Sequence, residues 1–240
     1  MGPVFSKLRD DLAWLQVKWR EYRELFGTSP DRIELLNRAA SLFFRVLQDS
    51  LWEDALLHLC RLTDPPTMRD KRNLTIQALP ELCADVDLRT ELATAVARAV
   101  VATEFARDWR NRRMSHRDLD LAIEPTAKPL ASGSRADVAA AMAAIHQVLN
   151  LIYERRFRTT LSDDIIGPNA GAEALLYVLR DGIEADQARR KRLESGEFTP
   201  EDRLRHSLYM VTAGDNHQVA ALQRIDEPVF VINPPRTIAR

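Results

Sequence analysis

The chain has 240 residues, of which 45% are hydrophobic, 29% charged and 7% aromatic, and its formal net charge at pH 7 is -1. This composition is typical of a soluble globular protein that is long enough to bury a core without disulfides or metals. The small net charge excludes a uniformly basic nucleic-acid binder, because attraction to phosphate requires a local concentration of Lys and Arg. Any nucleic-acid partner is therefore expected to bind through a local patch.

Two cysteines, Cys60 and Cys83, show neither the spacing of a zinc site nor that of a disulfide framework, which is typical of a reducing compartment. No apolar stretch approaches the roughly 20 residues of a membrane span, and no signal-peptide core is found. The sequence therefore predicts a cytoplasmic protein with no membrane partner, no metal and no cofactor.

Apolar residues recur at steps of three and four along most of the chain, which predicts an all-α fold of long antiparallel helices. In the first half of the chain, the predicted helices span residues 6–26, 30–64, 76–83 and 87–109, with a polar loop over 65–74. Gly27 is expected to end the first helix. Pro65 and Pro66 end the second, because a proline cannot continue a helix.

The second half begins with a connection over 118–134 that contains two prolines and a glycine. Ser134 and Asp137 have the spacing of a capping box and predict the start of a helix that runs to Tyr153. A further helix over 170–193 and a short segment from Thr199 follow. We expect one helical domain over residues 1–212 and a tail over 213–240, whose β-prone residues 229–232 either dock on a surface in extended form or fray.

The segment 107–118 concentrates positive charge, since it holds five arginines and His116 against two aspartates. Histidine side chains titrate near neutral pH and transfer protons, and a guanidinium can hold two phosphate oxygens at once. Such a pair can cleave a phosphodiester without a metal. The alternative is a solvated helix end stabilised by the helix dipole. The other arginines are scattered and fit a coding bias, because the chain has 29 arginines and five lysines.

Geometry limits the pairing of Arg110 with His116. At about 100° per residue, an unbroken α-helix would place them roughly 120° apart around its axis. Ser115 and Asp118 have the spacing of a capping box, which predicts that the helix ends near Met114 and that a new turn begins at Ser115. A symmetric dimer would be the other way to bring two such motifs together.

Arg110, Asn111 and His116 match the R-N-x4-H motif of the HEPN superfamily of all-helical domains, many of which are metal-independent ribonucleases of bacterial defence and toxin-antitoxin systems. The resemblance to the AbiU-type abortive-infection branch covers roughly residues 10–160. It rests on Ile33 to Asn37, Phe43-Phe44, Leu51 to Asp54, Arg61 to Pro66, Asn73 to Thr75 and Arg110 to Asp118.

This resemblance implies a homodimeric endoribonuclease with a HEPN-like helical bundle, which cleaves RNA through attack of the ribose 2'-hydroxyl. It implies proton transfer by His116, stabilisation of phosphate charge by Arg110, and orientation of this pair or of the substrate by Asn111. The residues implied in attraction of the RNA backbone are Arg112, Arg113 and Arg117. An antitoxin or neutralising protein is implied as a partner. Some toxins of the superfamily carry a modified Tyr two residues after the His, where this chain has Asp118.

Several other residues have both a structural and a functional interpretation. His58 is more typical of a core or groove histidine than of a catalyst. Arg61 and Asp64 lie at the end of a predicted helix, where such residues more often form an ion pair or cap the helix than take part in catalysis. Packing against segment 107–118 would instead place them in contact with the motif residues, in a supporting position. Residues 189–192 are typical of a solvated helix end. The four tryptophans, Trp14, Trp19, Trp52 and Trp109, are expected in the core or in an interface.

Two rival functions belong to other classes. A non-catalytic helical module would bind RNA or a protein without cleaving RNA. A structural dimerisation domain would show no salt-dependent affinity for RNA.

Overall fold

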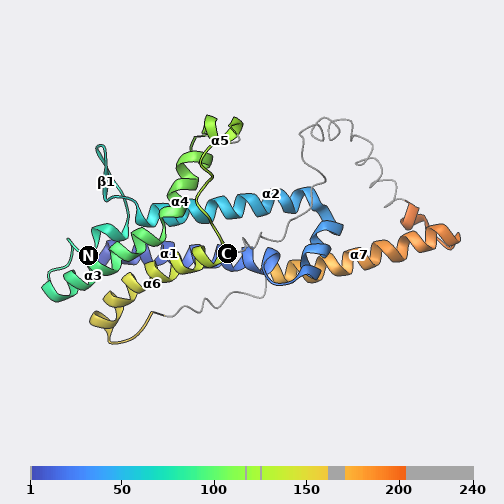
Figure 1. Cartoon of the computed structure of the whole chain (residues 1–240). Helices are drawn as coiled ribbons and strands as arrows, with labels where there is room; N and C mark the ends of the chain where they lie inside the picture. The colour runs from blue at the N-terminus through green and yellow to red at the C-terminus, as the bar shows by residue number, and fades with distance from the viewer. Residues whose placement is uncertain (1, 117, 125, 162–170, 204–240) are drawn as a thin grey trace. The chain divides into compact units, whose positions relative to one another are not determined.

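The computed structural model describes residues 2–116, 118–124, 126–161 and 171–203 (Figure 1). The helices are α1 (Gly2–Phe26), α2 (Pro30–Thr63), α3 (Val86–Ala102), α4 (Glu104–Trp109), α5 (Leu119–Ile123), α6 (Arg135–Phe157) and α7 (Ala172–Ser195). The shorter elements are strands β1 (Thr67–Met68) and β2 (Lys71–Arg72), a 3-10 helix (Ile76–Ala78) and a π-helical turn (Arg110–Met114). The prediction of an all-α fold is confirmed.

The described residues form two compact units. The first unit takes its described residues from 1–23 and 48–168, and the second from 24–47 and 169–234. The predicted domain boundary after residue 212, and the tail over 213–240, lie outside the described residues.

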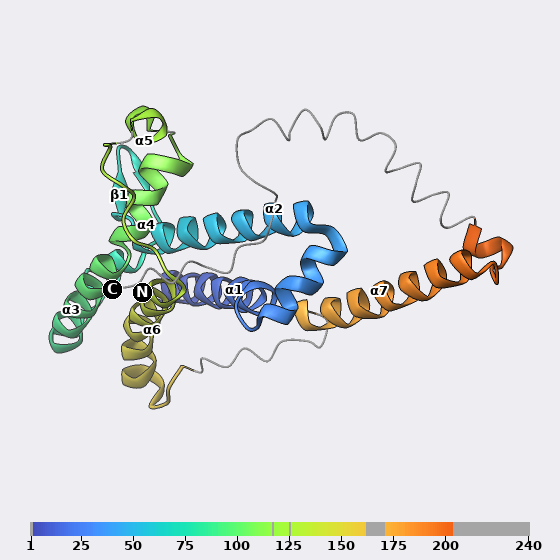
Figure 2. The same cartoon turned by 45° about the vertical axis from the view of Figure 1, so that its right-hand side comes forward.

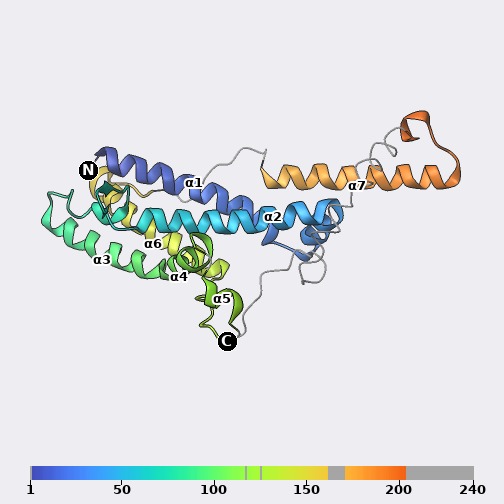
Figure 3. The ribbon, with the colours of Figure 1, turned by 90° about the horizontal axis from the view of Figure 1, so that it is seen from above.

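The first unit is a bundle of α1, the second half of α2, α3 and α6 (Figures 2 and 3). α1 and the second half of α2 are antiparallel (Figure 3), and Lys18 on α1 pairs with Asp54 on α2 at 2.7 Å. α3 and α6 are also antiparallel, and Arg155 pairs with Glu91 at 2.8 Å. The fully buried side chains of this bundle include Leu8, Leu12, Leu15, Leu56, Leu59, Leu62, Leu92, Ile145 and Leu149.

α6 is long and apolar enough to cross a membrane by length and composition alone, which corrects the expectation that no segment would reach that threshold. The same helix packs along α3 and has buried side chains at three- and four-residue steps, including Val138, Met142 and Ile145. Burial on this face accounts for its apolar composition.

Ser134 caps α6 as the sequence predicts. Its hydroxyl accepts from the Asp137 backbone N–H at 3.2 Å, and the Asp137 carboxylate accepts from the Ser134 backbone N–H at 2.8 Å. We expect Ser134→Ala to lower the free energy of unfolding by about 1 kcal/mol, because the Asp137 backbone N–H loses its acceptor. Urea unfolding would measure this change. Ser134→Thr keeps the hydroxyl and should restore most of the loss, and an equal loss in both variants would contradict the capping role.

The second unit contains the first half of α2 and the whole of α7. α2 was expected to be continuous, but Ala40 has an extended backbone (φ -165°, ψ 76°) that interrupts it. Beyond this interruption, Phe44 is buried while Phe43 is 61% exposed. In the predicted solvated end of α7, Arg189 and Arg190 pair with Asp186, and Arg192 pairs with Asp202.

The helix expected over 87–109 is divided at Thr103, which separates α3 from α4. The buried Thr103 hydroxyl bonds the Ala99 and Val100 carbonyl oxygens, each at 3.0 Å. Hydroxyl bonds of this kind compete with the backbone and bend helices. The expected loop over 65–74 contains the short β1–β2 hairpin, and only Ile76–Ala78 of the expected helix over 76–83 is helical, as a 3-10 helix.

Candidate functional site

Arg107 joins the end of α2 to the break between α3 and α4. Its Nη2 atom donates to the Thr63 carbonyl oxygen at 2.7 Å and to the Thr63 hydroxyl at 2.8 Å. Its Nη1 atom donates to the Val100 carbonyl oxygen at 2.9 Å and to the Thr103 hydroxyl at 3.0 Å. A cation at the negative end of a helix is favourable, and Arg107 adds hydrogen bonds to carbonyl oxygens at the ends of both α2 and α3. Arg107 therefore fixes α4 against the bundle.

Asp64, which follows the last residue of α2, holds Arg110 at the start of the π-helical turn. The Arg110 Nη1 atom is 2.8 Å from both carboxylate oxygens of Asp64. Both side chains are mostly buried, with 21% of Arg110 and 12% of Asp64 exposed. Burial lowers the pKa of Arg110, but hydrogen bonds and charge from Asp64 outweigh burial and raise it above its ordinary value. Arg110 is therefore a fixed cation held in one orientation.

The remaining donors of Arg110 are directed away from Asp64. Its Nε atom donates to the Asn111 side-chain oxygen at 3.2 Å. Its Nη2 atom donates to no residue in the described part of the chain. One edge of the guanidinium is thus available to an anionic ligand such as a phosphate.

The chain bends between Arg110 and His116 through the π-helical turn. The Ser115 backbone N–H donates to the Arg110 carbonyl oxygen at 2.8 Å, five residues back. The expected capping box at Ser115 is wrong: Asp118 is the cap, and its carboxylate accepts from the Leu121 backbone N–H at the start of α5. π-helical turns often occur at functional sites, because the extra residue redirects the side chains around it.

Arg112 and its neighbours hold the connection over 118–134 against the turn. Arg112 donates to Asp118 at 2.9 Å and to the Lys128 carbonyl oxygen at 2.7 Å. The Trp109 indole donates to the Ala131 carbonyl oxygen at 2.9 Å, and Asp108 accepts from the Ala131 backbone N–H. The bond from Arg112 also lowers the pKa of Asp118. These bonds occupy the Arg112 guanidinium in the fold.

Four described residues of segment 107–118 are exposed to solvent, namely Asn111, Arg113, Ser115 and His116. Arg113 lies over the Trp109 ring, 5.5 Å from its centroid, and is 3.9 Å from Glu53. Arg117 lies outside the described residues. The turn and the two residues after it therefore expose an amide, a guanidinium, a hydroxyl and an imidazole, while Arg110 at the start of the turn is partly buried.

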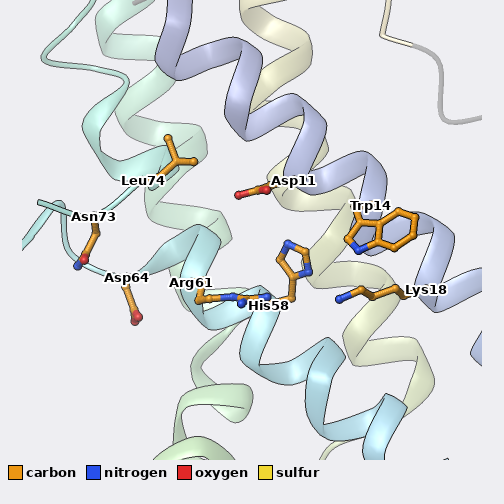
Figure 4. Close-up of a pocket in the computed structure, with 8 residues that line it drawn as sticks. All are labelled: Asp11, Trp14, Lys18, His58, Arg61, Asp64, Asn73 and Leu74. Atoms are coloured by element: carbon orange, nitrogen blue, oxygen red, sulfur yellow. The ribbon is translucent and has the colours of Figure 1, made fainter.

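A cavity of about 490 Å³ lies between α1, α2 and the residues after the β1–β2 hairpin (Figure 4). Asp64 lines it, and the same residue pairs with Arg110. The structure thus brings Asp64 against the motif, while Arg61 lies at the cavity and makes no ion pair with a described residue. Trp14, Lys18 and His58 are also in the wall.

His58 is 4% exposed, and its Nδ1 atom is buried without a hydrogen-bond partner in the described structure. Burial lowers the pKa of His58 to about 4, and the positive charges of Arg61 and Lys18 act in the same direction. Asp11 and Asp54 oppose them with smaller effects. The imidazole is therefore neutral at neutral pH.

This lowered pKa makes stability depend on pH. The ordinary pKa of histidine is 6.5, so between pH 6.5 and about 4 the unfolded chain binds more protons at His58 than the folded protein. The free energy of unfolding should therefore fall as pH is lowered through this window, by at most about 3 kcal/mol. Urea unfolding from pH 7 to pH 4 would measure the slope. His58→Gln does not titrate and should flatten the profile, and an equally steep profile would contradict the assignment.

Sequence reasoning gave no individual role to Arg107. Its spacing of four from Thr103 was visible, but its bonds to Thr63 join residues 44 positions apart. Likewise, only the fold shows that no acidic side chain of the described residues forms an ion pair with Arg61.

Comparison with protein-family models matches residues 3–175 to the HEPN family described as AbiU2. Searches of the curated proteins and of the solved structures each found no match to this chain. The match covers most of the chain, including every residue of the site described above. The chain belongs to the AbiU2 family of HEPN domains.

Proposed function

We propose that the protein is a metal-independent endoribonuclease of bacterial defence, with Arg110 and His116 at its active site. The observation that carries the proposal is the orientation of Arg110. Asp64 fixes one side of the guanidinium at 2.8 Å, and its Nη2 atom remains available beside the exposed residues of the π-helical turn. A cation held in place in advance stabilises the charge of a phosphoryl transition state without reorganisation.

In the proposed reaction, the ribose 2'-oxygen forms a bond to the neighbouring phosphorus, and the bond from phosphorus to the 5'-oxygen breaks. A proton leaves the 2'-hydroxyl, and another reaches the departing 5'-oxygen. His116 transfers one of these protons, since an imidazole acts as an acid or a base near neutral pH. The products are a 2',3'-cyclic phosphate and a 5'-hydroxyl end.

The other residues of the segment divide between binding and positioning. We propose that Asn111 and Arg113, both exposed, contact the RNA backbone, together with Arg117. Arg112 donates to Asp118 and to two backbone carbonyls, which favours a role in positioning the connection over 118–134. We further propose a cytoplasmic homodimer that places two copies of the turn in one cleft. Light scattering should then give twice the 27.3 kDa mass of the chain.

The test is incubation of the purified protein with labelled RNA in EDTA, with separate measurement of RNA binding at several salt concentrations. Cleavage that yields cyclic phosphate ends supports the nuclease. Salt-dependent binding without any cleavage would favour a non-catalytic RNA-binding module. A protein that neither binds nor cleaves RNA would contradict both.

A further inference from the structure

The wall of the cavity beside Asp64 contains charged groups that the fold does not neutralise. Lys18 pairs with Asp54, and Asp64 pairs with Arg110. By contrast, Asp11 and Arg61 pair neither with each other nor with another residue in the described ranges, although both line the cavity. One carboxylate and one guanidinium are therefore available to a ligand that carries both a hydrogen-bond donor and an anionic group.

A buried polar atom in the same wall also lacks a partner. Nδ1 of His58 has no hydrogen bond to the described protein, although the side chain is almost completely buried. Leaving such a group unpaired is unfavourable, and groups of this kind are usually bonded to protein or to water. The cavity is the space that this imidazole lines (Figure 4).

Trp14 differs from the other three tryptophans. Trp52 packs against both Trp19 and Trp109, with ring centroids 6.0 and 6.1 Å apart. Trp14 instead is 57% exposed at the edge of the cavity, with the Lys18 ammonium 6.0 Å from its ring centroid. It therefore does not belong to the predicted core. An exposed aromatic face beside basic groups is the arrangement on which single-stranded bases stack.

We propose that this cavity binds one nucleotide, with its phosphate at Arg61, its base on Trp14 and a donor of the base edge at Asp11. The volume of about 490 Å³ is that of a small-ligand site and cannot admit an RNA duplex. Asp64 forms part of its wall and also holds Arg110 at 2.8 Å, which joins the cavity to the motif. We assign this nucleotide to the RNA substrate, next to the linkage that is cleaved, and this assignment rests on the proposed function.

The first experimental arm uses free nucleotides and is independent of cleavage. The full chain is titrated with GMP, AMP, CMP and UMP, and binding is followed by calorimetry. Arg61→Ala and Trp14→Ala should each weaken binding about 10- to 100-fold, the range expected for loss of one stacked base or one phosphate contact. Trp14→Phe should retain most of the affinity. Arg98→Ala, an exposed arginine on α3, is the matched control and should bind like the wild type.

The second arm uses single-stranded RNA bound to the His116→Ala protein, so that cleavage cannot interfere. Adding Arg61→Ala or Trp14→Ala to this protein should weaken RNA binding at least about 10-fold. In the protein that retains His116, either substitution should raise KM for RNA cleavage with little change in kcat. The cavity assignment is overturned if none of the four nucleotides binds and the Arg61 and Trp14 variants bind RNA as tightly as the His116→Ala protein. Nucleotide binding that depends on Arg61 while RNA affinity does not change would overturn the RNA source. If Arg61→Ala and Trp14→Ala weaken the binding of both nucleotide and RNA but the wild type does not cleave RNA, only the proposed nuclease activity is contradicted.

Discussion

Replacement of His116 with alanine should lower the rate of RNA cleavage by about 10²- to 10⁴-fold, the usual contribution of a general acid or base. The residue is exposed at the end of the π-helical turn, and no hydrogen bond in the described structure depends on it. The variant should therefore fold like the wild type and retain its affinity for RNA. Single-turnover cleavage in EDTA measures the effect, and anisotropy with labelled RNA measures the binding.

Two control variants sharpen this test. Arg98→Ala removes an exposed arginine of α3 outside the motif and should leave cleavage unchanged. His116→Gln keeps a polar side chain without proton transfer and should be as inactive as His116→Ala. Cleavage at the wild-type rate in both His116 variants would remove His116 from the active site. RNA affinity lost together with activity would instead indicate a binding role.

The second large effect is expected at Asp64, and it concerns both stability and activity. Asp64→Ala leaves the mostly buried cation of Arg110 without its partner, and it also removes the charge 4.0 Å from Arg107. Removal of one member of a buried pair is costly, so the free energy of unfolding should fall by about 2 to 4 kcal/mol. Because Arg110 then loses its fixed orientation, cleavage should also fall at least about 10-fold. Urea unfolding and single-turnover kinetics measure the two effects.

A double-mutant cycle separates the pair from its surroundings. Asp64→Ala, Arg110→Ala and the double variant should give a coupling energy of about 1 to 3 kcal/mol. The matched control is Glu91→Ala, which breaks the pair with Arg155. Both members of that pair are about half exposed, so the expected change is below about 1 kcal/mol. Additive effects of the Asp64 and Arg110 variants would show that the contact does not position Arg110.

The positions of the helices could be predicted from the sequence, because they depend on local patterns. Apolar steps of three and four residues located α1, α2, α6 and α7 to within a few residues, together with the start of α3. The capping box at Ser134 was correctly located for the same reason, since its two partners are three residues apart. The resemblance to HEPN domains rested on residue identities within short segments. The family match over residues 3–175 confirms it.

The breaks in the helices could not be predicted. The apolar stripe continues through Ala40 and Thr103, so the local pattern gives no sign of the kink in α2 or of the division between α3 and α4. The Thr103 hydroxyl contacts that of Thr63 at 3.0 Å, 40 residues away, which no local pattern reveals. The bend expected at Ser115 was placed correctly, but it is a π-helical turn instead of a capping box.

The sequence by itself determined which residues carry charge and proton-transfer chemistry, because residue type and spacing are local properties. The tertiary structure decided which of them are available. Arg110 and Asp64 are 46 residues apart in sequence and 2.8 Å apart in the fold, whereas Arg61, only three residues before Asp64, lines the cavity and forms no ion pair within the described part of the chain. Electrostatic pairing and burial depend on distances in space, so the chain must fold before a charged residue is either neutralised or left for a ligand.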